Sequence, residues 1–166
     1  MTTGATVVDG VQRKTTAQQT EAAPIVAAVD GTPANAVAVE TAVNLAAELE
    51  APIVFVYVRR GPAGFLGTPV YQRQLTAEMT RGLRVLDRAL EAAAAAGVDA
   101  DGEILEGTPR RRIAEFARSR GARFVVVGSR RRKIGRSVSR GVARAAGRPV
   151  VVAHGLNRLA TAGKAG

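Results

Sequence analysis

The chain has 166 residues, of which 46% are hydrophobic and 23% charged, and its formal net charge is +10. This length suffices for one domain with a full hydrophobic core, and the composition is ordinary for a soluble globular protein. The chain has no cysteine and one histidine, which excludes a disulfide framework, a thiol nucleophile and the usual zinc sites.

The charge is distributed unevenly along the chain. Residues 1–109 hold eight Lys and Arg against thirteen Asp and Glu, whereas residues 110–166 hold sixteen against one. The two parts therefore carry net charges of −5 and +15. This asymmetry is typical of a protein with a polyanionic partner, and arginines on solvated helix faces would produce the same pattern.

The two ends of the chain differ from the part between them. Residues 1–23 are rich in threonine and glutamine and have neither a helical nor a strand period, so we expect a flexible tail. We expect the same of residues 154–166, with one folded domain over residues 24–153. Residues 1–20 lack the apolar stretch of a secretory signal, and no apolar run is long enough for a membrane span. The expected location is the cytoplasm, with no membrane partner.

Short apolar runs rich in valine alternate with helical patterns along this domain. They are PIVAAV (24–29), PIVFVYV (52–58), RFVVVG (123–128) and PVVVA (149–153). Continuous apolar runs of this length are typical of strands covered on both faces, as in a parallel sheet. GEILEG (102–107) is more polar and is expected to form a further strand at a sheet edge.

Helical patterns separate these strands. The spacing of apolar residues predicts four buried stripes: Ala38, Ala42, Leu45 and Leu49; Met79, Leu83, Leu86 and Leu90; Ile113, Phe116 and Ala117; Val138, Val142 and Ala145. Gly97 is expected to end the second helix, and Thr108 and Pro109 to open the third. Alternating strands and helices give a doubly wound α/β sheet, which binds ligands at the carboxyl ends of its strands.

Two loops follow strands at that edge, DGTPAN (30–35) and GSRRRKIGRS (128–137). The second loop nearly matches the nucleoside-triphosphatase pattern G-x4-G-K-[ST], but Arg130 and Arg136 stand where this pattern needs glycine and lysine. The sequence contains no second motif for magnesium, no recognisable Ser-His-Asp set and no G-x-G-x-x-G. We therefore predict that the protein is not an enzyme.

These residues resemble the universal stress protein family over residues 24–153. The resemblance rests on AVDGT and VYV closing the first two strands, EGTPRRRI opening the third helix, VVVGSR closing the fourth strand, and SVSRGVARAAGRPVVV. It implies a Rossmann-like fold with a five-stranded parallel sheet ordered 3-2-1-4-5 and helices on both faces. It also implies a homodimer and, in one branch of the family, ATP held between the first and fourth strands.

The resemblance implies positions for an adenine nucleotide. In the ATP-binding branch, adenosine is contacted by the aspartate after the first strand and by a valine that ends the second. Here these positions are Asp30, followed by Gly31 and Thr32, and Val58. Asp30 also fits the cap of the turn into the first helix, and the two roles are compatible. The phosphates would lie after the fourth strand, against Gly128, Ser129, Arg130, Arg136, Ser137 and Val138.

The phosphate loop departs from the family pattern G-x2-G-x9-G-[ST], whose small residues let backbone N–H groups approach phosphate. Gly128 fits the first glycine, but Arg131 stands at the second. Gly141 fits the third, yet no hydroxyl residue follows it, and this register leaves the last helix under about two turns. We therefore expect the helix to start at Ser137, with the loop shortened and Arg136 in place of its last glycine.

The expected function is that of a regulatory, stress-response dimer with a degenerate adenine-nucleotide pocket that binds ATP weakly or not at all, without a metal. We expect the two chains of the dimer to pair through residues 149–153, because the free edge of an apolar strand can hydrogen-bond to a strand of another chain. Two alternatives stay open: an ATP-binding stress protein with an arginine-rich phosphate loop, and a polyanion-binding protein on the same scaffold. Sequence-specific nucleic-acid binding is not expected, because only 4% of residues are aromatic and none lies in the loop.

Overall fold

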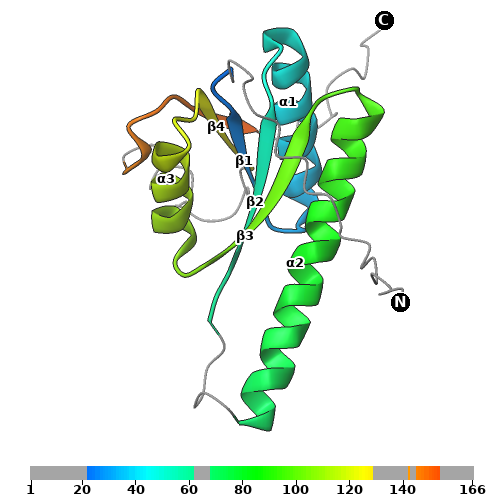
Figure 1. The fold of residues 1–166 in the computed structure, drawn as a ribbon, viewed down its shortest axis with the longest axis vertical. Helices are drawn as coiled ribbons and strands as arrows, with labels where there is room; N and C mark the ends of the chain where they lie inside the picture. Colours follow the sequence, from blue (N-terminus) through cyan, green and yellow to red (C-terminus); the bar gives the residue numbers. More distant parts are fainter. Residues whose placement is uncertain (1–21, 62–67, 129–141, 143–144, 154–166) are drawn as a thin grey trace, which may run out of the picture.

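The computed structural model describes residues 22–61, 68–128, 142 and 145–153. Five strands form one sheet: β1 (Ile25–Val29), β2 (Ile53–Arg59), β3 (Ala100–Glu106), β4 (Phe124–Gly128) and β5 (Val150–Ala153). Their order is β3-β2-β1-β4-β5 and all neighbours are parallel (Figure 1), which confirms the predicted topology and the edge position of the polar strand. That strand begins two residues earlier than expected and ends at Glu106.

Helices cover both faces of the sheet. α1 (Pro33–Leu49) and α2 (Pro69–Ala95) pack on one face, and α3 (Pro109–Ser119) packs on the other (Figure 1). Val142 and Ala146, which precede β5 and are helical, are buried in the same cluster as α3. Among the described residues, no helix is long and apolar enough to cross a membrane.

The two-sided cover explains the continuous apolar runs in the sequence. Successive side chains of a strand point to opposite faces. Ile25 and Ala27 of β1 therefore pack against α1 and α2, while Val26 packs against α3. Val126, in β4, has no exposed surface. A strand with both faces buried has no solvent side on which a polar residue would be tolerated.

The buried helical stripes are offset from the predicted ones. Leu83 is 52% exposed, so its predicted core position is wrong. Ala145 is also exposed, and the neighbouring Ala146 is buried instead. The helix faces that contact the sheet carry mainly small side chains, so α1 and α2 approach the sheet closely. The buried residues are Ala38, Val39, Ala42, Val43 and Ala46 of α1 and Gly82, Val85, Leu86, Ala89 and Ala93 of α2.

Several of the larger predicted stripe residues lie at the margins of the core. Leu45, Leu49, Leu90 and Phe116 are half-buried beside it, and Met79 is half-buried. Val138 lies outside the described residues.

The predicted helix ends are confirmed. Gly97 directly follows Ala96, the C-cap residue of α2. Its φ is 69°, a left-handed conformation that glycine adopts without strain. Thr108 is the N-cap of α3 and Pro109 its first residue, although the Thr108 side chain makes no capping hydrogen bond. The start of the last helix at Ser137 lies outside the described residues.

Candidate functional site

The strand register brings three predicted site residues to one edge of the sheet. Val29 of β1 lies beside Tyr57 of β2, and Ala28 lies beside Val127 of β4. One residue further along each strand, the chain reaches Asp30, Val58 and Gly128. These three residues therefore meet at the carboxyl ends of the central strands, where α/β sheets bind ligands.

Asp30 organises the turn from β1 into α1. Its carboxylate oxygen Oδ1 accepts hydrogen bonds from the Thr32 backbone N–H at 3.0 Å and from the Thr32 hydroxyl at 2.6 Å. The Asp30 backbone N–H donates to Oδ1 of Asn35 at 3.0 Å. Asp30 is exposed, so the carboxylate caps this turn while it remains accessible to a ligand.

Gly31 permits α2 to lie against this turn. Its φ is 72°, and a Cβ atom placed on it would lie 2.8 Å from Cγ2 of Val85. Both the left-handed backbone and the missing side chain are therefore needed here. The turn that carries Asp30 and Thr32 is held between α1 and α2.

Gly128 at the end of β4 lies against the first turn of α1. A Cβ atom on Gly128 would lie 2.9 Å from the backbone oxygen of Ala34. Because that neighbour is backbone rather than a flexible side chain, the helix would have to move to accept any larger residue. The close approach of β4 to α1 thus depends on this glycine.

Tyr57 of β2 and Glu78 of α2 form a polar pair near the same edge. The Tyr57 hydroxyl donates to Oε2 of Glu78 over 3.4 Å, and the Tyr57 ring is packed against Gly82. Burial raises the pKa of the Tyr57 hydroxyl above 10.0, and the charge of Glu78 raises it further, while Arg81 opposes the shift. Asp30 also raises this pKa, which links the pair to the β1–α1 turn.

The raised pKa of Tyr57 predicts a loss of stability at high pH. In the unfolded chain the phenol ionises near pH 10, whereas in the folded protein it ionises at a higher pH. Below pH 10 both states hold the proton, and as the pH rises above 10 only the unfolded state releases it. We expect the free energy of unfolding in urea to fall between about pH 9 and 11. This fall should be smaller in Tyr57→Phe, and an equal fall in the parent protein and in Tyr57→Phe would contradict the prediction.

Arginines gather where β2 ends and α3 begins. Arg59 pairs with Glu106 at the end of β3, and its Nη1 atom is buried without a hydrogen-bond partner among the described residues. On α3, Arg111 and Arg112 both bond to Glu115, at 2.7 and 2.8 Å. The guanidinium groups lower the pKa of this carboxyl, with Arg111 the larger cause. α3 carries four arginines and one acid, Glu115, which makes its surface basic.

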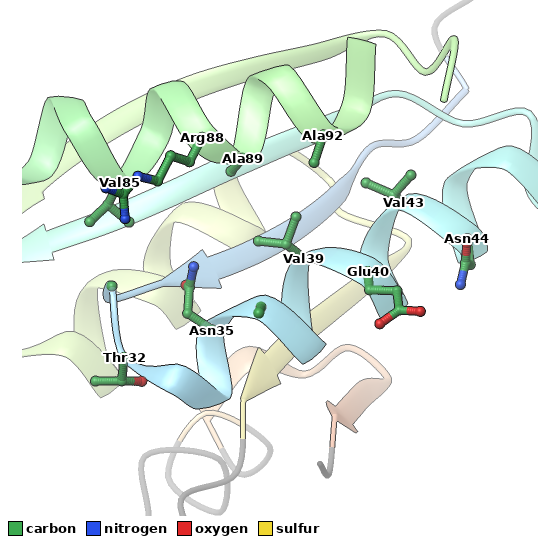
Figure 2. Close-up of a pocket in the computed structure, with 12 residues that line it drawn as sticks. Thr32, Asn35, Val39, Glu40, Val43, Asn44, Val85, Arg88, Ala89 and Ala92 are labelled. Carbon is green, nitrogen blue, oxygen red and sulfur yellow. The ribbon is translucent and has the colours of Figure 1, made fainter. Parts of the chain in front are cut away.

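A cleft of about 450 Å³ opens between α1 and α2, next to the β1–α1 turn. Gly31 and Thr32 lie at one end, and Val39, Val43, Val85 and Ala89 line its interior (Figure 2). This volume is within the range of small-molecule sites in proteins. The cleft therefore shares Gly31 and Thr32 with the predicted nucleotide site.

The structure describes half of the predicted site residues. It brings Asp30, Gly31, Thr32, Val58 and Gly128 to one edge, whereas Ser129, Arg130, Arg136, Ser137 and Val138 lie outside the described residues. Sequence reasoning missed Asn35 and the pair of Tyr57 with Glu78. The spacing of Asn35 at the third helical position after Thr32 was a usable signal, since that position often bonds back to the turn. No group of His, Cys, Asp or Glu in the described part of the chain could hold a metal ion.

The fold is that of a doubly wound α/β protein whose strand order reverses between β1 and β4, the place at which such sheets bind ligands. The universal stress protein family matches residues 22–154, and the chain belongs to this family.

Individual relatives agree with this assignment. Universal stress protein YxiE of Bacillus subtilis is 32% identical over 112 residues, which cover 62% of this chain and 76% of the relative. The structure of a universal stress protein family member from Burkholderia pseudomallei is 29% identical to this chain, with a TM-score of 0.66. The match covers 78% of this chain and 94% of the Burkholderia chain. The Archaeoglobus fulgidus protein in complex with dAMP has the same fold, with 23% identity, a TM-score of 0.63 and coverage of 78% and 95%.

Proposed function

We propose that this universal stress protein is a regulatory, non-enzymatic dimer that binds an adenine nucleotide weakly at the carboxyl ends of β1, β2 and β4. The ligand class is supported by the dAMP complex of the Archaeoglobus fulgidus relative, which has the same fold. The observation that carries the proposal is the meeting of Asp30, Val58 and Gly128 at one edge of the sheet.

The chemistry of this edge suits a nucleoside. The exposed Asp30 carboxylate offers an acceptor for ribose hydroxyls, the contact that acidic residues make in dinucleotide-binding sheets. Val58 supplies a half-buried apolar surface beside it. Gly31 and Gly128 let α2 and α1 pack closely at this edge, which holds the turn that carries Asp30 in place.

The phosphates of ATP should add little to this affinity, because the sequence replaces the small residues of the phosphate loop with arginine. Each lost hydrogen bond to a charged oxygen costs about 1.5–3 kcal/mol, so the loss of two weakens binding by about a hundredfold or more. Exposed arginines recover at most about 1 kcal/mol for each ion pair. We expect ATP to bind weakly, with a strong salt dependence, and to be neither retained in purification nor hydrolysed.

Calorimetry with AMP and ATP at about 0.15 M salt tests this expectation. Asp30→Asn should weaken both nucleotides, since it removes the charge but keeps an oxygen for the Thr32 N–H. Asp87→Asn, on the exposed surface of α2, is the matched control and should bind as the parent does. A submicromolar, salt-insensitive ATP affinity would contradict the degenerate phosphate loop, and equal affinity in Asp30→Asn would contradict the site itself.

We propose dimerisation through residues 149–153, which contain β5. Among the described residues, β5 pairs with β4 alone, so one edge of this valine-rich strand is unpaired. Such edges pair readily with another chain, and a two-fold axis lets the same strand meet itself. We expect light scattering to give the mass of a dimer at micromolar concentration. A monomer mass under these conditions would refute the interface.

A polyanion is the second candidate ligand. It is favoured by the arginines at the end of β2 and the start of α3. Arg59 pairs with Glu106, and Arg111 and Arg112 share the carboxylate of Glu115. Arginines that neutralise phosphates release bound counterions, so the affinity for a polyanion falls steeply as the salt concentration rises. Polyphosphate that binds with a steep salt dependence and is not displaced by AMP would favour this candidate over the nucleotide.

A further inference from the structure

The cleft between α1 and α2 has an apolar interior. Val39, Val43 and Val85 are each under 10% exposed, and Ala89 is 1% exposed. The exposed Ala36 and Ala92 also line the cleft, and their small side chains leave it open to solvent. An apolar molecule placed here would lose water contact against both helices, which is favourable in proportion to the buried area.

One end of the cleft carries hydrogen-bond donors. Oδ1 of Asn35 already accepts from the Asp30 N–H, so its amide nitrogen remains as a donor, and Figure 2 shows this nitrogen pointing toward α2. Arg88 extends along α2 toward Val85 at the same end, and it forms no salt bridge with the described residues (Figure 2). The first turn of α1 adds the positive end of its helix dipole.

The other half of the cleft differs in charge. Glu40, about 7.5 Å beyond Asn35 along the helix axis, and Asn44 line it from α1, and both side chains point away from α2 (Figure 2). Asn35 and Asn44 are nine residues apart, which is about 13 Å along the helix axis. The cleft therefore runs from a cationic, donor-bearing end to an end flanked by a carboxylate, with an apolar interior between them.

We infer that this cleft binds a medium-chain carboxylate, with its anionic head at Arg88 and Asn35 and its acyl chain over Val39, Val43 and Val85. A guanidinium and an amide N–H₂ together match the acceptor oxygens of a carboxylate. Glu40 would repel the same head in the other half of the cleft, which sets the orientation. This site does not depend on the nucleotide site, although the two meet at Gly31 and Thr32.

Decanoate is the probe that tests this inference, with calorimetry for affinity and amide NMR to locate the site through Val39 and Val85. Each buried methylene is expected to tighten binding about three- to fourfold, so octanoate should bind about tenfold more weakly. Decyltrimethylammonium, which has the same chain length and the opposite charge, should not bind in the cleft. Saturating AMP should leave decanoate bound, which separates this site from the proposed nucleotide site.

Matched variants give the decisive comparison. Arg88→Gln should weaken decanoate at least tenfold, whereas Arg84→Gln, an exposed arginine of α2 outside the cleft, should not. Ala92→Phe should fill the cleft and abolish binding, and Ala94→Phe on the exposed surface should not. The inference is overturned if decanoate does not bind at millimolar concentration, if folded Arg88→Gln and Ala92→Phe bind it normally, or if the cationic probe binds equally well.

Discussion

Replacement of Val126 by aspartate is expected to unfold the protein. Val126 has no exposed surface and lies in β4, between β1 and β5 in the sheet. Its cluster contains residues of β1, β2, α1 and α2. The described residues of this cluster are apolar apart from Tyr57, so they offer no cation to pair with a carboxylate there. An unpaired buried carboxylate costs several kcal/mol, which is comparable to the whole stability of a typical domain.

Circular dichroism and a thermal scan measure this effect directly. Val70→Asp is the matched control, since Val70 is 52% exposed at the start of α2 and should accept the same substitution with little change. A Val126→Asp protein with the parent melting temperature would be incompatible with a buried central strand.

Gly128→Ala is expected to destabilise the protein by about 1–3 kcal/mol, the usual cost of overpacking. The new methyl group would lie 2.9 Å from the backbone oxygen of Ala34, so α1 must shift away from β4. That shift carries the turn of Asp30 and Thr32 with it, because Thr32 is the N-cap of α1. The proposed nucleotide affinity should therefore fall together with stability.

The glycine of β3 provides the control for this substitution. A Cβ atom on Gly102 would meet the Leu86 side chain at an ordinary 3.5 Å, so Gly102→Ala should be neutral or slightly stabilising. For a chain of this length, each kcal/mol lost corresponds to about 2–4 °C in melting temperature. If Gly128→Ala melts like the parent and keeps its Ala34 amide resonance in place, the close contact with α1 is not a constraint.

The arrangement of elements was predictable from local patterns. Valine-rich runs such as RFVVVG bury all their side chains only where both faces of the strand are covered. In a parallel sheet, helices cover both faces. The more polar GEILEG marked a strand that tolerates solvent, and it lies at the edge as β3. The glycine and proline signals at Gly97 and Pro109 act within a single turn, so they required no tertiary information.

The buried helix faces were less predictable. The spacing of leucines placed Leu83 in the core, yet the sheet contacts the face of α2 that carries Gly82, Val85 and Ala89. Close packing of a helix on a sheet favours small residues, so the largest apolar side chains can lie at the margin of the contact. Periodicity indicates that a helix is amphipathic but leaves the direction of its buried face uncertain by about one residue.

The sequence by itself determined the fold class, because alternating strand and helix patterns are local. Its resemblance to universal stress proteins supplied the family, the strand order and the edge at which Asp30, Val58 and Gly128 meet. Only the tertiary structure decided which side chains meet across elements. The contact of Gly128 with Ala34, the pair of Tyr57 with Glu78 and the cleft between α1 and α2 each join residues from different elements. Such contacts depend on how closely two elements approach, a distance that packing of the whole core sets and that no local pattern encodes.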